Sequence, residues 1–179
     1  EEPRSVRTGN PAKYRTRRSK FLRLPEFRGY LQSFIDRVEG TDNGRNQPRG
    51  WIEGELQDLC ITRDMDWGVD YPNGDGEELV LYVWVDAPIE YVAATKQYTE
   101  RVGTDTYDWE AAWKPGGESR YGMTFEEDWQ AESGEIIHII GRDIIQHHCV
   151  FWPAMLRGAG YNEPRAVLAT GFVNIDGDA

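Results

Sequence analysis

Apolar and polar positions follow a helical period in the first third of the chain. From Phe27 to Val38 apolar side chains recur every three or four residues, as on one face of an amphipathic helix. Residues 40–50 (GTDNGRNQPRG) are rich in turn formers and predict the end of that helix. A second helical stretch is predicted from Trp51 to about Leu59, and residues 1–20 are expected to form an extended connector.

Three short apolar runs further along the chain predict strands. Residues 79–85 (LVLYVWV) are nearly continuously apolar, as in a strand buried on both faces, and residues 136–140 and 166–169 indicate two more buried strands. One helix is expected to begin at the N-cap Asp86, with Pro88 in its first turn, and to run to about Val102. A second helix is expected over 144–158. This alternation is typical of an α/β fold with a parallel, doubly wound sheet.

The connecting segments carry less regular patterns. Residues 60–69 are expected to form an ordered loop that ends in a turn at residues 71–76, and residues 103–133 to form short helices and loops over the sheet. Ligands of parallel sheets bind at the carboxyl ends of the strands. A site is therefore expected near residues 84–86, 141–143 and 170–171.

Composition narrows the class of protein. The 179 residues are 39% hydrophobic and include seven Trp, which suffices for a packed core. The apolar runs are strand-sized, the N-terminus does not resemble a signal peptide, and a cytoplasmic protein without a membrane partner is expected. Cys60 and Cys149 lack CxxC partners, so neither a structural zinc site nor a disulfide framework is expected in this chain.

Charge is abundant and unevenly distributed. The formal net charge is −11 and only four of the 20 basic residues are lysines, a composition that suits a salt-adapted host, although an ordinary acidic cytosolic protein is the alternative. Residues 1–24 hold eight basic residues against Glu1 and Glu2. One interpretation of this basic arm is that it binds phosphate, but a linker with solvated charges is the simpler interpretation.

Residues of the kinds that bind ligands follow the strand at 136–140. Gly141 permits a close backbone approach, and Asp143 either caps the next helix or accepts hydrogen bonds from a ribose or an amino group. Ile144, His148 and Trp152 share one helical face, which suits a pocket for an uncharged side chain. Pro153 predicts a kink beside Trp152.

The histidines at 138, 147 and 148 invite a metal hypothesis. Residues 147, 148 and 149 diverge on a helix and cannot converge on one ion, so no metal is expected there, and a packing or ligand-contacting histidine is preferred to a general base. Trp84 is expected to face the ligand edge with space beside its indole, and Tyr91 to lie on the same helix. Arg63 offers a strong cation.

Four blocks of the chain carry a resemblance to the methionyl-tRNA synthetase family of class I aminoacyl-tRNA synthetases. CITRDMDWGV (60–69) resembles a segment shared by the methionine, isoleucine, valine, leucine and cysteine subgroup. YVWVDAPIEY (82–91) resembles the family's YVWFDAPIGY, residues 136–161 its HFIGKDIxxFHxLFWPAML block, and GFVNIDG (171–177) the segment before its KMSKS loop. The resemblance covers essentially the whole chain.

The resemblance implies a fold and a function. Residues 77–179 would form the C-terminal half of a Rossmann-like catalytic domain, and residues 1–76 a helical connecting segment that follows the family's zinc insertion. The implied reaction is methionine activation with ATP and Mg²⁺ and transfer to tRNA(Met), without DNA as a partner. The HIGH and KMSKS motifs and the zinc site are absent from this chain, so activity of these residues alone is not expected.

The resemblance also implies roles for residues. Arg63 and Asp143 would be catalytic, and Gly141 with Asp143 would contact ATP. Methionine would be bound by a further group of side chains: Trp84, Ala87, Pro88, Tyr91, Ile144, His148 and Trp152. Glu90 replaces a usual Gly, and Gln146 with His147 replaces an aromatic pair. The alternatives are a sister synthetase for leucine, isoleucine or valine, a non-catalytic paralogue that binds tRNA or a partner, and, more weakly, a general nucleotide-binding α/β domain.

Overall fold

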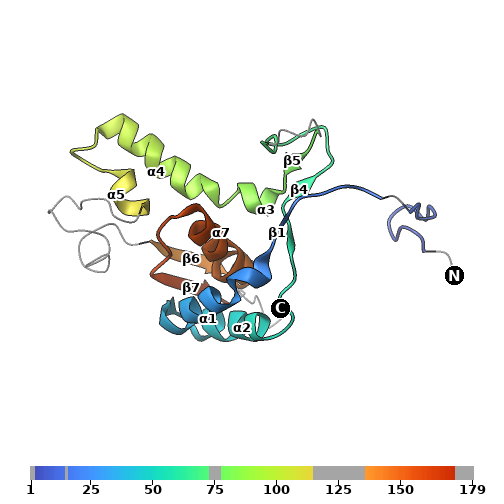
Figure 1. The fold of residues 1–179 in the computed structure, drawn as a ribbon, viewed down its shortest axis with the longest axis horizontal. Helices are drawn as coiled ribbons and strands as arrows, with labels where there is room; N and C mark the ends of the chain where they lie inside the picture. The colour runs from blue at the N-terminus through green and yellow to red at the C-terminus, as the bar shows by residue number, and fades with distance from the viewer. Residues whose placement is uncertain (1–2, 15, 73–77, 115–135, 172–179) are drawn as a thin grey trace, which may run out of the picture.

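A three-stranded parallel sheet organises the chain in a computed structural model that describes residues 3–14, 16–72, 78–114 and 136–171. The strand order is β2 (Glu39–Gly40), β7 (Ala166–Thr170) and β6 (Ile137–Gly141) (Figure 1). The parallel α/β sheet and the strands near 136–140 and 166–169 are confirmed. The predicted strand 79–85 does not join this sheet, where β2 takes the third place.

Among the described residues one face of the sheet is buried and the other is largely exposed. His138, Ile140, Val167 and Ala169 are buried, whereas Ile137, Ile139 and Leu168 expose 50%, 74% and 38% of their surface. Alternating side chains of a strand point to opposite faces, so the prediction that 136–140 is wholly buried is wrong for one face.

Helix α1 (Arg28–Arg37) confirms the helical period of the N-terminal third. It follows the short 3₁₀ turn η1 (Leu24–Phe27) and buries Leu31, Phe34 and Ile35 in the main core. That core also contains side chains of α2, β6, β7 and the helix after β6. It therefore draws on both of the predicted parts, 1–76 and 77–179, and the division into two parts remains a prediction.

Helix α2 (Asp42–Glu53) corrects the prediction of a turn over 40–50 followed by a helix over 51–59. Its turn-forming residues serve packing, because Gly44 brings the helix backbone against the carbonyl of Val167. Pro48 lacks the N–H that would bond the Gly44 carbonyl, and the Cys149 thiol donates to that carbonyl instead, at 3.3 Å. Burial raises the pKa of the Cys149 thiol to about 12, which keeps it a donor.

Glycine at position 40 is required by the sheet. Gly40 has φ of +153°, and a Cβ there would lie 2.0 Å from the carbonyl oxygen of Val167. Only glycine accommodates both the backbone conformation and the contact, and this lets β2 pair with β7 just before α2 begins.

The described residues between 59 and 86 contain three short antiparallel strands and one helical turn. Strand β1 (Phe21–Leu22) pairs with β3 (Leu59–Cys60), and β4 (Thr62–Arg63) pairs with β5 (Val80–Leu81). The ordered loop predicted for 60–69 therefore includes strand residues. The predicted strand 79–85 ends at Leu81, and α3 (Val83–Asp86) follows. A short apolar run fits a buried strand or a buried helical turn equally well, and here the turn buries Val85.

Helix α4 (Ile89–Val102) ends where the sequence predicted, at Gly103. Its N-cap position is Pro88, so the prediction of Asp86 as the N-cap is wrong, because Asp86 is the last residue of α3. Helix α5 (Trp109–Trp113) is capped by the Asp108 carboxylate and confirms a short helix within 103–133, of which residues 115–133 lie outside the described part. None of the described helices is long and apolar enough to cross a membrane.

The helix after β6 is irregular ahead of Pro153. A 3₁₀ turn η2 (Arg142–Ile144) leads into a π-helical turn η3 (His147–Phe151), and α7 (Trp152–Ala159) follows. The N–H of Trp152 bonds the carbonyl of His147, five residues back. The sequence predicted a kink at this place, and the disturbance takes the form of this wider turn, which leaves room for a proline without an N–H.

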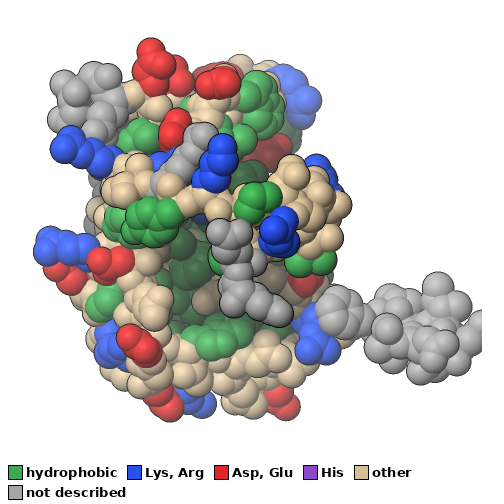
Figure 2. All heavy atoms as spheres, turned by 90° about the vertical axis from the view of Figure 1, so that its right-hand side faces the viewer, with side chains coloured by type: hydrophobic (Ala, Val, Ile, Leu, Met, Phe, Trp, Pro, Cys, Tyr) green, Lys and Arg blue, Asp and Glu red, His purple; other side chains and the backbone are tan. Residues whose placement is uncertain are grey.

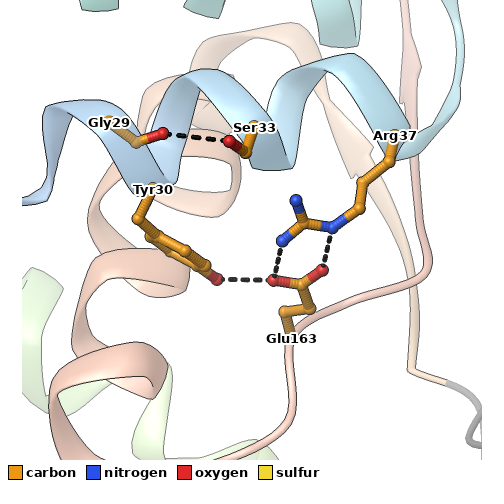
Figure 3. A network of polar contacts seen from close by, with 5 residues as sticks. All are labelled: Gly29, Tyr30, Ser33, Arg37 and Glu163. Carbon is orange, nitrogen blue, oxygen red and sulfur yellow. Dashed lines mark hydrogen bonds and ion pairs between the residues drawn. The ribbon is translucent and has the colours of Figure 1, made fainter.

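A polar cluster fastens α1 to the segment before β7 (Figure 3). The Tyr30 hydroxyl donates to Glu163 at 2.8 Å, and Arg37 donates two hydrogen bonds to the same carboxylate, at 2.7 and 2.8 Å. Burial and the neighbouring Glu163 raise the pKa of Tyr30, so its proton stays available for the bond.

Candidate functional site

Four aromatic and imidazole side chains gather where α4, β6 and the η3–α7 helix meet. The Tyr91 hydroxyl lies 2.9 Å from Nε2 of His148. The ring of His138 lies 4.9 Å from that of Tyr91 and 5.0 Å from that of His148, centroid to centroid. Trp152 closes the group, with its ring 6.2 Å from Tyr91. We call these four residues the imidazole cluster.

The hydrogen bonds of His148 define its protonation state. Its Nδ1 lies 3.0 Å from the carbonyl oxygen of Ile144, which can only accept, so Nδ1 carries the proton. In the neutral ring Nε2 is then the acceptor, and the Tyr91 hydroxyl donates to it. Burial lowers the pKa of His148, which favours this neutral form.

His138 is the more strongly shifted histidine of the cluster. Burial, and secondarily the nearby His148, lower the pKa of His138 to about 4. Both rings are therefore neutral near pH 7. The imidazole cluster is a polarisable, uncharged wall, which suits an uncharged side chain better than a carboxylate or an ammonium group.

Some polar atoms in and beside this cluster have no partner within the described residues. They are Nε2 of His138, Nδ1 of His147 and Nε1 of Trp152, all of them buried. A buried polar atom without a hydrogen bond costs free energy, and a bound water or ligand is one way to supply the missing partner. A cleft of about 450 Å³ is lined by His138 and Tyr91 of the cluster, together with Thr95, Tyr107, Trp113 and the other residues of 136–140.

Trp84 lies on α3 and not at the end of a strand, which corrects its expected location. Its indole stacks on the His147 ring with 4.1 Å between centroids and a 30° tilt. His147 in turn meets Phe151 edge-on at 5.4 Å. Ala87 and Pro88 form the joint between α3 and α4, with Ala87 exposed and Pro88 buried. The His147 imidazole thus packs between two aromatic rings, those of Trp84 and Phe151.

The remaining predicted residues lie at two other places. Gly141 and Asp143 are in contact with each other at the carboxyl end of β6. The Arg63 guanidinium stacks on Tyr82, 3.7 Å from the ring centroid, and donates to the Thr62 carbonyl at 2.8 Å. Arg63 borders a second cleft, together with Asp86. The structure thus brings together Tyr91, Ile144, His148 and Trp152, and it places Arg63 in another group of contacts.

His138 is the member of the imidazole cluster that sequence reasoning missed as a site residue. The alternation within β6 was the available signal, because it places His138 and Ile140 on the same face of the strand. Within the described residues no group of three or more His, Cys, Asp or Glu side chains is arranged to hold a metal ion.

Comparisons with known proteins agree over the whole chain. The profile of the family described as tRNA synthetases class I (M) matches residues 1–179. A methionine–tRNA ligase of Haloarcula marismortui is 74% identical over 181 residues, which cover 100% of this chain and 25% of that protein. A methionine–tRNA ligase of Halobacterium salinarum is 64% identical. That match covers 99% of this chain and 23% of that protein. These relatives come from halophilic archaea, in agreement with the salt-adapted composition.

A solved structure is similar as well. It is Mycobacterium tuberculosis methionyl-tRNA synthetase bound by methionyl-adenylate, with a TM-score of 0.64 and 29% identity, over 97% of this chain and 30% of that one. The same protein without a ligand gives a TM-score of 0.63. The chain spans about a quarter of the length of the curated relatives that it matches.

Proposed function

The chain belongs to the class I tRNA synthetases of the methionine type, and on that premise we propose that the whole protein activates methionine with ATP and transfers it to tRNA(Met). The observation that carries the proposal is the imidazole cluster, in which Tyr91 holds a neutral His148 beside His138 and Trp152. A thioether side chain is uncharged and polarisable, and it packs well against aromatic and imidazole rings.

In the proposed pocket the methionine side chain lies against Tyr91, His148 and Trp152, with Trp84 on the adjoining wall. Ile144, Ala87 and Pro88 limit its length. The similar M. tuberculosis protein binds methionyl-adenylate, which supports methionine and an adenylate as ligands of the whole protein. His147, which keeps Trp84 stacked, positions that wall from behind.

The chemistry consists of two displacements. The methionine carboxylate attacks the α-phosphorus of ATP, the bond to the β-phosphate oxygen breaks, and pyrophosphate leaves. A ribose hydroxyl at the tRNA terminus then attacks the methionyl carbonyl, and AMP leaves. Positioning and electrostatic stabilisation supply most of the rate in such reactions.

Three residues of this chain are assigned to the nucleotide side. Gly141 lets the nucleotide approach the backbone, the Asp143 carboxylate accepts from the ribose or from the methionine amino group, and Arg63 neutralises phosphate charge at the mouth of the site. Mg²⁺ bound to the phosphates would share that charge. Asp143 is exposed, and its carboxylate would be the ligand that this chain supplies to the ion. We assign the protein to the cytoplasm, where tRNA is charged.

Amino-acid-dependent exchange of pyrophosphate into ATP by the full-length protein tests the proposal. Methionine, leucine, isoleucine, valine and cysteine are offered in turn at low and high KCl. Exchange with methionine alone is expected. Exchange with a branched aliphatic amino acid would assign a sister synthetase, and no exchange from a folded protein would favour a non-catalytic paralogue.

A further inference from the structure

The cleft of about 450 Å³ between α4, α5 and β6 shares two residues with the imidazole cluster. Tyr91 and His138 belong to the cluster and also line this cleft, whereas His148 and Trp152 are not among the described residues that line it. We call it the β6 cleft. Residues that belong to both places form the boundary between them, so a phenol ring and an imidazole ring separate the cluster from the cleft.

Exposure orders the imidazole cluster in depth. Tyr91 exposes 39% of its surface, whereas His138 exposes 7%, His148 4% and Trp152 3%. The His138 ring meets the His148 ring edge-on, with 66° between their planes and 5.0 Å between their centroids. It also lies 4.9 Å from the Tyr91 ring. His138 therefore lies deeper than Tyr91 and packs against both partners of the Tyr91–His148 hydrogen bond.

The imidazole of His138 differs from the other buried polar side chains of the described residues, which are those of Thr62, Thr99 and His148. Each of those three takes part in a side-chain hydrogen bond. Nε2 of His138 has no hydrogen-bond partner within the described residues. Removal of an unpaired buried nitrogen offsets part of the cost of the cavity that a shorter side chain leaves. Position 138 is therefore expected to tolerate shortening better than position 148.

The lining of the β6 cleft suits an apolar group. It includes Ala94, Tyr107, Ala112 and Trp113. The indole N–H of Trp113 donates to the Thr95 hydroxyl at 2.8 Å, so these two polar groups are already paired with each other. An alkyl group that entered the cleft would displace water from apolar and aromatic surface.

The β6 cleft is separate from the side of the molecule that Figure 2 draws. Figure 2 shows the side on which β4 and β5 lie, with Lys, Arg, Asp and Glu side chains around hydrophobic ones. In Figure 1, α5 lies at the opposite side of the molecule from β4 and β5. A group that extends into the β6 cleft would therefore stay among α4, α5 and β6, away from those charged side chains.

We propose that His138 determines which side chains the methionine pocket accepts, because its ring closes the pocket toward the β6 cleft. The inference rests on the proposed function, in which the methionine side chain lies against Tyr91 and His148. A smaller residue at position 138 joins the pocket to the cleft. The protein then accepts longer S-alkyl homologues of methionine, of which the S-ethyl homologue, ethionine, is the simplest.

The test measures pyrophosphate exchange into ATP by the full-length protein, with methionine and with ethionine, and compares the ratio of the two kcat/KM values. His138→Ala is expected to raise the ratio of ethionine to methionine about tenfold, the usual range for one methylene group in an apolar pocket. His138→Val leaves a smaller space and is expected to raise the ratio less. His138→Phe keeps a ring and is expected to leave the ratio within about twofold.

Leu168→Ala is the matched control. Leu168 lies on the neighbouring strand β7, on the face of the sheet opposite to His138, and its side chain is partly exposed. The change shortens a side chain of the same sheet without opening the pocket, so the ratio is expected to stay unchanged. A thermal melt of each variant checks that the fold is intact. If His138→Ala does not fold, the comparison of His138→Val with His138→Phe decides in the same way.

Two results would overturn the inference. A loss of both activities in equal proportion in His138→Ala would leave the ratio unchanged and would assign a purely structural role to the ring. Equal ratios in His138→Ala and His138→Phe would show that the volume of the side chain does not matter. Exchange by the unsubstituted protein separates the two claims. No exchange with methionine removes the proposed function, whereas exchange with an unchanged ratio in the variants removes only this inference.

Discussion

The carboxylate of Asp143 lies over the α-carbon of Gly141. A Cβ built on Gly141 would come within 2.7 Å of Oδ1 of Asp143, while the φ of Gly141, −76°, suits any residue. Glycine is therefore needed here for space and not for backbone conformation. The absence of a side chain at position 141 leaves space for this carboxylate at the carboxyl end of β6, where parallel sheets hold their ligands.

Replacement of Gly141 by Ala tests this contact. The added methyl group displaces a flexible, exposed carboxylate, so the free energy of unfolding is expected to change by less than about 1 kcal/mol. The rate of methionine-dependent pyrophosphate exchange is expected to fall about tenfold, because Asp143 is turned away from the nucleotide. Gly29→Ala on α1, where a Cβ meets nothing within 4 Å, is the control and should leave the rate unchanged. An unchanged rate in Gly141→Ala would remove Asp143 from the site.

The contact of Tyr30 with Glu163 predicts a graded loss of stability. Tyr30→Phe removes one hydrogen bond but leaves Glu163 bonded to Arg37, at an expected cost of about 1 kcal/mol. Glu163→Gln weakens the bonds to both partners and is expected to cost more. Ser33→Ala, which removes a bond from an exposed hydroxyl to the Gly29 carbonyl within the same helix, should be nearly neutral. Thermal unfolding measures all three, and an equal effect of Tyr30→Phe and Ser33→Ala would contradict the assignment.

The depressed pKa of His138 predicts a loss of stability in acid. Between its unfolded pKa of about 6.5 and its folded pKa of about 4, the unfolded chain takes up a proton that the folded chain does not. Stability is therefore complete above pH 6.5 and falls as the pH drops toward 4, by up to about 1.4 kcal/mol per pH unit from this group. His138→Phe keeps a ring without the titration and should fall less steeply between pH 6.5 and 4. Parallel curves for the two proteins would contradict the assignment.

The sequence predicted those elements whose apolar residues had a clear period or whose ends were marked by a clear stop signal. Helix α1 repeats apolar residues over three turns, and α4 ends at a glycine with positive φ, so both were found. Strands β6 and β7 were found from apolar, β-branched runs. The parallel pairing follows from the intervening helix, because strands joined by a crossover run in the same direction.

The sequence failed where tertiary contacts decide the local structure. Residues 42–50 look like a turn, yet they form a helix because Gly44 packs on β7 and Cys149 satisfies the carbonyl that Pro48 leaves unpaired. Residues 79–85 look like a strand, yet β4 offers only two residues to pair with, and the chain turns into α3. Neither outcome can be read from a period of 2 or 3.6.

The imidazole cluster was predictable in part. The spacing of Ile144, His148 and Trp152 indicated one helical face, and the family resemblance added Tyr91. The approach of His138 depends on how β6 packs against α4 and the following helix, which one sequence does not specify. The stack of Trp84 on His147 likewise depends on α3, an element that the apolar run concealed.

Tyr91→Phe tests most directly the central claim that the imidazole cluster holds methionine. The change removes the hydroxyl that donates to His148 and little else. In pyrophosphate exchange by the full-length protein, kcat/KM for methionine is expected to fall about five- to tenfold, mainly through KM. Tyr98→Phe, at a similarly exposed tyrosine on the same helix, is the matched control and should stay within about twofold of the unsubstituted protein. Equal kcat/KM values for the two variants would contradict the claim.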